Sequence, residues 1–103
     1  MFVGLTRVHT GDQPIQTASI VGEEMARWFR DVEGFRGFLM ISREGTTIGL
    51  SFWEDRDAAQ RNRMPRAQFI ERISALMNVE IEERSEYEVM FAEFAPLGTD
   101  RTM

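Results

Sequence analysis

The stretch Gly34-Phe35-Arg36-Gly37-Phe38-Leu39-Met40-Ile41 decides the fold, together with the pair Trp53-Glu54, which begins twelve residues after Ile41. Its run of four apolar residues predicts a strand over residues 35–43. Successive side chains of a strand point to opposite faces, so both faces of this strand must be covered. Glu44-Gly45 fits a two-residue hairpin turn, and the next strand, over residues 46–53, ends at Trp53.

A helix is predicted before this hairpin. It runs from Thr17 or Ser19, either of which is a fair N-cap, to about Glu33, and Gly34 supplies its C-terminal stop. Its apolar face consists of residues at helical spacing: Val21, Met25, Trp28, Phe29 and Val32.

A second helical region follows the hairpin and is interrupted by Pro65. The sequence predicts a short helix near residues 55–63 and then a longer helix that has Pro65 in its first turn and Asn78 at its end. The buried stripe predicted for the longer helix is Phe69, Ile70, Ile73, Leu76 and Met77.

Two further strands complete the domain, one over residues 2–9 and a long one from Val79 to about Phe94. The order β-α-β-β-α-β predicts an α+β, ferredoxin-like domain over residues 1–94, with a four-stranded antiparallel sheet and its helices on one face. Residues 95–103 are interpreted as a loose tail.

The other face of the sheet is predicted to be apolar as well. In the last strand Val89 and Phe91 point to one side, and Met90, Ala92 and Phe94 point to the other. Helices on one face leave the second face bare, so we expect a homodimer joined through its sheet faces.

Composition excludes several classes of function. The chain of 103 residues has no cysteine and no lysine, which removes thiolate nucleophiles, cysteine metal sites and Schiff-base chemistry. A net charge of −5 argues against a nucleic-acid partner. The start of the sequence lacks a targeting pattern and no run of eighteen apolar residues occurs, so a cytoplasmic protein without membrane contact is expected.

Three motifs resemble the dimeric α/β-barrel superfamily, and within it the antibiotic-biosynthesis-monooxygenase-like domains. They are residues 34–38 at the helix-to-strand junction, residues 50–54 at the end of the third strand, and Tyr87-Glu88-Val89 in the fourth. The resemblance covers roughly residues 2–92. It implies a pocket between sheet and helices, in a superfamily that contains cofactor-free monooxygenases of aromatic polyketides, haem-degrading monooxygenases and proteins without known function.

The haem-degrading branch fits poorly. It resembles this chain at Trp53, but it needs an asparagine in the first strand, where Thr6 is the closest residue. It also needs an iron-binding histidine at the position of Arg63, and arginine cannot ligate iron. We therefore expect no haem, no other cofactor and no metal.

Six residues are candidates for the site. Trp53 and Trp28 are predicted to contact a planar substrate, although each also fits a core position. Either Arg63 or Asn62 is predicted to hold an anion, and either His9 or Tyr87 to assist proton transfer. His9 at a strand end also fits a solvated residue, and the cluster Arg61, Arg63 and Arg66 also fits a solvated face paired with the Glu-rich last strand.

Two functions follow from these residues and from the resemblance. The first is a small-molecule monooxygenase that acts without a cofactor on a planar, hydrophobic, phenolic substrate. The second is a non-catalytic, stress-associated or ligand-binding dimer with the same pocket, which the shortage of acid–base groups favours. A domain that serves only for dimerisation is a third interpretation.

Overall fold

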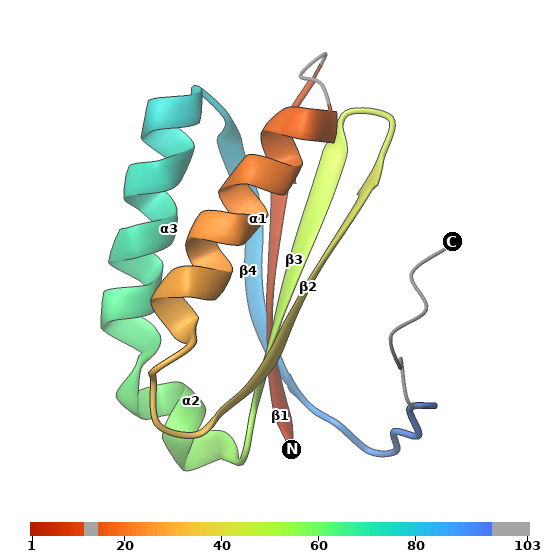
Figure 1. Cartoon of the computed structure of the whole chain (residues 1–103), viewed down its shortest axis with the longest axis vertical. Helices are drawn as coiled ribbons and strands as arrows, with labels where there is room; N and C mark the ends of the chain where they lie inside the picture. The colour runs from red at the N-terminus through yellow and green to blue at the C-terminus, as the bar shows by residue number, and fades with distance from the viewer. Residues whose placement is uncertain (12–14, 96–103) are drawn as a thin grey trace.

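The computed structural model describes residues 1–11 and 15–95 of the chain. Its elements are β1 (Phe2–His9), α1 (Ile15–Phe29), β2 (Phe35–Arg43), β3 (Thr46–Trp53), α2 (Arg56–Arg61), α3 (Arg63–Met77) and β4 (Glu80–Glu88). The four strands form one antiparallel sheet in the order β2-β3-β1-β4. Helices α1 and α3 lie on the same side of it (Figure 1). The predicted ferredoxin-like architecture is confirmed.

The core lies between the helices and the sheet. Phe29 of α1 and Trp53 at the end of β3 are its largest fully buried side chains, and their rings meet edge to face at 5.8 Å. Its other buried apolar members are Phe2, Met25, Ala58, Ala59 and Ile70. The apolar face predicted for the first helix is confirmed, because Val21, Trp28 and Val32 pack against this cluster.

The first helix begins and ends earlier than predicted. It starts at Ile15 and ends at Phe29, and two turns follow, closed by hydrogen bonds from Val32 N–H to Phe29 C=O and from Phe35 N–H to Val32 C=O. These turns let Val32 reach the core after the helix has ended. Gly34, with φ +85°, therefore serves the entry into β2 and is not the helix stop.

The second helical region divides as the sequence predicts. Asp55 caps α2 by accepting a hydrogen bond of 2.9 Å from Ala58 N–H, and Pro65 lies in the first turn of α3. Asn78 ends α3 in the left-handed conformation, with φ +57°. The predicted stripe is wrong at Leu76, which is 76% exposed.

The last strand is shorter than predicted because its only partner among the described strands ends. β4 pairs with β1, where Glu88 lies opposite Phe2, and the final bond runs from Val89 N–H to Met1 C=O. A bulge interrupts this pairing between Arg7 and Val8. Residues 89–95 therefore belong to no strand, and the two apolar faces predicted for them do not form.

The second face of the sheet is apolar, and no helix of the described chain covers it (Figure 1). Strand alternation places on it Val3, Leu5, Leu39, Ile41, Ile48, Leu50 and Phe52. Leu39 and Ile41 are each 48% exposed. Phe94 approaches Phe52 edge to face at 6.4 Å but is itself 73% exposed. We call this surface the open face.

Among the described residues no helix is both long enough and apolar enough to cross a membrane.

Replacing Gly34 tests how β2 is connected. A Cβ atom at this position would lie 2.5 Å from Cβ of Ala58, and its φ of +85° disfavours any other residue. We expect Gly34→Ala to lower the free energy of unfolding by about 3 kcal/mol, from backbone strain and overpacking together. The measurement is urea denaturation followed by tryptophan fluorescence.

The matched control is Gly37→Ala in the same strand, where a Cβ atom would meet nothing closer than Phe52 at 3.9 Å. This control should lose less than about 1 kcal/mol. Equal losses in the two variants would contradict the account of Gly34.

Candidate functional site

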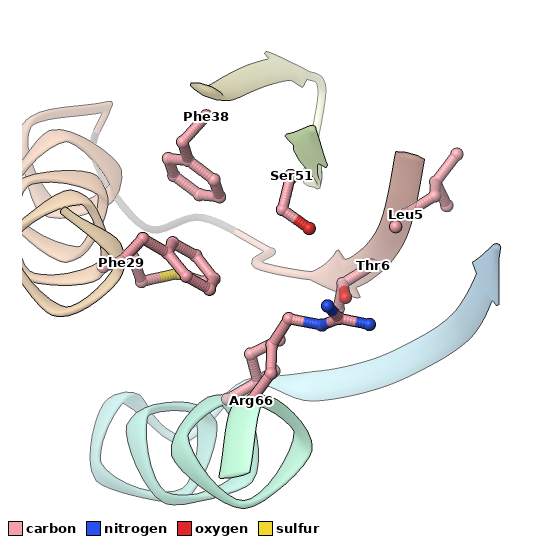
Figure 2. Close-up of a pocket in the computed structure, with 10 residues that line it drawn as sticks. Leu5, Thr6, Phe29, Phe38, Ser51 and Arg66 are labelled. Atoms are coloured by element: carbon pink, nitrogen blue, oxygen red, sulfur yellow. The ribbon is translucent and has the colours of Figure 1, made fainter. Parts of the chain in front are cut away.

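A hollow lies between the sheet and helices α1 and α3 (Figure 2). The volume of the cavity itself is about 30 Å³, and the wider depression around it, open solvent included, is about 290 Å³. Such a cavity has room for about two water molecules, whereas small-molecule pockets start at about 300 Å³, so a ligand enters only if the lining side chains move apart. The residues that line it are Gly4, Leu5, Thr6, Met25, Phe29, Phe38, Gly49, Ser51, Arg66 and Ile70.

The wall of the hollow has an apolar part and a polar end. Met25 and Phe29 of α1, Phe38 of β2 and Ile70 of α3 supply its apolar part. Figure 2 shows Arg66 reaching from α3 toward the sheet, with Ser51 and Thr6 nearby. The chemistry of this wall matches a flat apolar molecule that has a polar group at one end, once the walls have moved apart to admit it.

Arg66 is the unusual residue of this wall, because it is charged and only 7% exposed. Its guanidinium carbon lies 5.0 Å from the ring centre of Trp53, a cation–π distance. Its Nη2 donates to Oε2 of Glu86 at 2.8 Å, and its Nη1 donates to the backbone oxygen of Ala59 at 3.4 Å. The cation is thus held between the ring of Trp53 and a carboxylate of β4.

Glu86 serves two arginines at once. Besides Arg66 it accepts hydrogen bonds from Arg63, one of them from Nε at 3.2 Å. The hydrogen bonds and the charge of Glu86 raise the pKa of Arg63. Burial lowers the pKa of Arg66, and the carboxylate of Glu86 opposes this shift. The two cations and one anion leave this cluster with a positive excess.

Ser51 joins the same end of the hollow. It is 5% exposed and accepts a hydrogen bond of 2.9 Å from the indole Nε1 of Trp53. That bond fixes the ring of Trp53 under the guanidinium of Arg66. Trp53 is fully buried and is not part of the lining, so in this structure it supports the hollow from behind.

The other predicted site residues lie outside the hollow. Trp28 stacks on Phe69 at 5.1 Å beside the core, and the side-chain nitrogen of Asn62 donates to Ala58 C=O between α2 and α3. Arg63 is exposed and is linked to the lining residue Arg66 through Glu86, which pairs with both arginines. The roles assigned to these three residues stay predictions.

The two predicted proton-transfer residues are not part of the lining. His9 is exposed at the end of β1. Tyr87 is 52% exposed, and its pairing with Val3 places it on the open face. The structure therefore does not bring these two residues together with Arg66 or Ser51, and their catalytic roles stay predictions.

Sequence reasoning did not single out Arg66 and Ser51 as site residues. Arg66 stood among three arginines, and only the predicted pairing of that cluster with the Glu-rich strand pointed to Glu86. One signal was available: Arg66, Ile70 and Ser74 recur every fourth residue, and these are the buried positions of α3. Two of these three buried positions are occupied by polar residues, Arg66 and Ser74, so a search for apolar residues at helical spacing does not find them.

Within the described residues, no three His, Asp or Glu side chains are grouped as a metal site would require.

Removing Arg66 tests its structural role. Arg66→Met keeps the length of the side chain but leaves Glu86 with Arg63 alone, so we expect the free energy of unfolding to fall by about 2–3 kcal/mol. Arg84→Met is the matched control, because Arg84 also links β4 to α3, through Glu71 at 3.0 Å, but on the surface. It should lose less than about 1 kcal/mol, measured in the same urea titration. Equal losses would show that Arg66 has no special structural role.

No model of a known protein family matches the sequence. No curated protein matches it either. Solved structures do match in fold. One is a candidate antibiotic biosynthesis monooxygenase from Deinococcus radiodurans, with a TM-score of 0.69 and 14% identity over 93% of this chain and 99% of that one.

Two further matches come from Streptomyces. SnoaB, a cofactor-independent oxygenase from Streptomyces nogalater, has a TM-score of 0.66 and 17% identity over 88% of this chain and 94% of that one. A monooxygenase from the gene ActVA-Orf6 of Streptomyces coelicolor, in complex with nanaomycin D, has a TM-score of 0.60 and 20% identity over 92% of this chain and 91% of that one. The chain therefore has the fold of the antibiotic-biosynthesis-monooxygenase-like proteins.

Proposed function

We propose that this protein is a monooxygenase that oxidises a small, planar phenolic molecule without a cofactor. The observation that carries the proposal is the hollow between sheet and helices, whose apolar wall of Met25, Phe29, Phe38 and Ile70 ends at the buried cation of Arg66. The fold supports it, since SnoaB is a cofactor-independent oxygenase. Fold alone does not fix function, so the proposal depends on the chemistry of the hollow.

The reaction needs only molecular oxygen as a second reactant. A phenolic substrate with a benzylic CH₂ group loses a proton to give a carbanion, and the electron pair of this anion forms a C–O bond with O₂. The resulting hydroperoxide, protonated from solvent, loses water to give a C=O group. One oxygen atom thus enters the substrate, the other leaves as water, and the substrate supplies all four electrons.

The contribution of the protein is to bind the anion and to exclude water from it. Among the residues of the described chain that line the hollow, none is a carboxylate, histidine or tyrosine. A substrate therefore has to be bound as the anion rather than deprotonated by a neighbouring base. The positive charge of Arg66 favours that ionised form.

A second candidate function is binding without catalysis. The observation that favours it is the position of His9 and Tyr87, which are both exposed and both outside the lining of the hollow. A protein that only sequesters or senses a planar metabolite has no need of an acid or a base. The same hollow would then hold the ligand without turnover.

We also propose that the protein is a homodimer joined through the open faces of two sheets. Support comes from the apolar residues of that face and from Leu39 and Ile41, which are each 48% exposed. Contiguous apolar surface of this kind is characteristic of interaction sites. A two-fold axis would pair the same patch on both copies.

Oxidation is tested with anthrone in air-saturated buffer, by quinone absorbance and oxygen consumption. We expect quinone formation well above the buffer rate, with one O₂ consumed per quinone. Gly49→Val should abolish the excess rate, because Gly49 lines the hollow and its added side chain would fill it.

Gly49→Ala is the graded control. Its Cβ atom would lie 3.6 Å from the ring of Phe38, an ordinary contact that leaves most of the space open. It should retain most of the activity. If anthrone binds with no turnover, the non-catalytic function replaces the enzyme. If neither binding nor turnover occurs, both small-molecule functions fail for this substrate class.

Association is tested by light scattering at micromolar concentration. We expect a dimer for the wild-type protein and a monomer for the double variant Leu39→Glu, Ile41→Glu, because it places two charges on the open face. Leu76→Glu on α3, which is 76% exposed, is the control and should remain dimeric. A wild-type monomer contradicts the proposed dimer.

A further inference from the structure

The polar side chains at the end of the hollow are Arg66, Ser51 and Thr6, and among them Arg66 can only donate hydrogen bonds. A guanidinium has five N–H donors, and the contacts of Arg66 to Glu86 and Ala59 account for two of them. Ser51 uses its oxygen to accept from Trp53, which leaves its O–H group to donate to another acceptor. The complement of this set is an oxygen that accepts from both residues.

Gly4 keeps the space between the two donors open. A Cβ atom at this position would lie 3.0 Å from Oγ of Ser51 and 3.6 Å from Nη2 of Arg66. Gly4 and Ser51 are direct cross-strand partners in β1 and β3, so the backbone fixes their positions relative to each other. Because Gly4 has no side chain, a small space remains that borders on both Oγ of Ser51 and Nη2 of Arg66.

The charge of this end also selects its ligand. Arg63 and Arg66 share one carboxylate, that of Glu86, and the lining within the described chain contributes no further acid. A negatively charged oxygen would complete the balance of charge. Hydrogen bonds to such an oxygen are roughly twice as strong as those between neutral groups, and the buried position of Arg66 shields them from solvent.

We propose that this place is an oxyanion site, in which Arg66 and Ser51 bind the charged oxygen of a planar aromatic acid above Gly4. The aromatic body would lie against Phe29 and Phe38, whose side chains would have to move apart to admit it, because the cavity measures only about 30 Å³. The inference rests on the proposed function, since it concerns the same hollow, and it narrows the ligands to phenolates and carboxylates.

The site would replace a catalytic base. It stabilises the ionised form of a bound phenol over the neutral form, so the pKa of that phenol falls on binding. A phenol that is neutral in solution would thereby ionise inside the hollow and release its proton to solvent. A carboxylate ligand would bind in the same way but could not be oxidised by this route.

The test is a binding measurement with the full-length protein and two aromatic probes of similar shape, naphthoate and uncharged acetylnaphthalene. We expect the wild-type protein to bind naphthoate at least roughly tenfold more tightly. Arg66→Met should remove this preference while acetylnaphthalene changes less than about twofold, and Arg84→Met should retain it. Gly4→Ala, which leaves both donors in place but fills the space between them, should also remove it, whereas Gly37→Ala should not.

A naphthol probe gives a second readout, because its two protonation states differ in fluorescence. Bound naphthol should ionise at lower pH than free naphthol in the wild-type protein and in Arg84→Met, but not in Arg66→Met. Circular dichroism establishes that each variant is folded. If Arg66→Met does not fold, Gly4→Ala and Ser51→Ala decide the question.

Three results would overturn the oxyanion site: equal binding of the two probes, no binding of naphthoate, or a preference that survives in both Arg66→Met and Gly4→Ala. These results are distinct from a failure of the oxidation assay. If anthrone is not oxidised but the preference and its loss in the variants are seen, the oxyanion site stands and the enzyme proposal falls. If anthrone is oxidised at the wild-type rate by Arg66→Met and Gly4→Ala, the enzyme proposal stands and the oxyanion site falls.

Discussion

A single buried cation constrains the way in which the helices of this protein sit on its sheet. The guanidinium of Arg66 projects from α3, lies 5.0 Å from the ring centre of Trp53 and is bound by Glu86 at 2.8 Å. It cannot be displaced cheaply, because a charge that loses its partner inside a protein costs several kcal/mol. The contact joins α3 to β4, the strand that the described sheet holds from one side only. Arg66 also lines the hollow, together with Gly4 on the opposite wall.

The two faces of the sheet differ in composition. The face toward the helices combines the aromatic core with the polar end of the hollow, whereas the open face is almost wholly apolar over β2 and β3. Solved structures of monooxygenases with this fold match nearly the whole chain at 14–20% identity. At such identity the likeness shows the fold alone, and the chemistry has to be argued from Arg66, Ser51 and Gly4 themselves.

Most of the fold can be predicted from the sequence, because the elements depend on local signals. The apolar run at 38–41, the turn at Glu44-Gly45 and the alternation that ends at Trp53 each act over a few residues. The end of β4 could not be predicted in this way, since it depends on where its pairing partner β1 begins.

The site could be predicted less well than the fold. Arg66 and Glu86 are twenty residues apart, and their burial depends on the packing of α3 against β4. Trp53 was correctly placed at the junction of sheet and helices, but only the packing shows that it lies behind Arg66 and outside the lining.

The composition of β4 has a consequence for how copies of this chain can meet. Five of its nine residues are glutamates, its pairing with β1 contains a bulge, and no described strand occupies its outer side. A strand added there would have to bring its backbone alongside a row of carboxylates, on an edge that the bulge has already twisted. Fibre-like growth from strand edge to strand edge is thereby discouraged at β4. The proposed dimer uses the open face instead, where a two-fold axis would close the assembly at two copies.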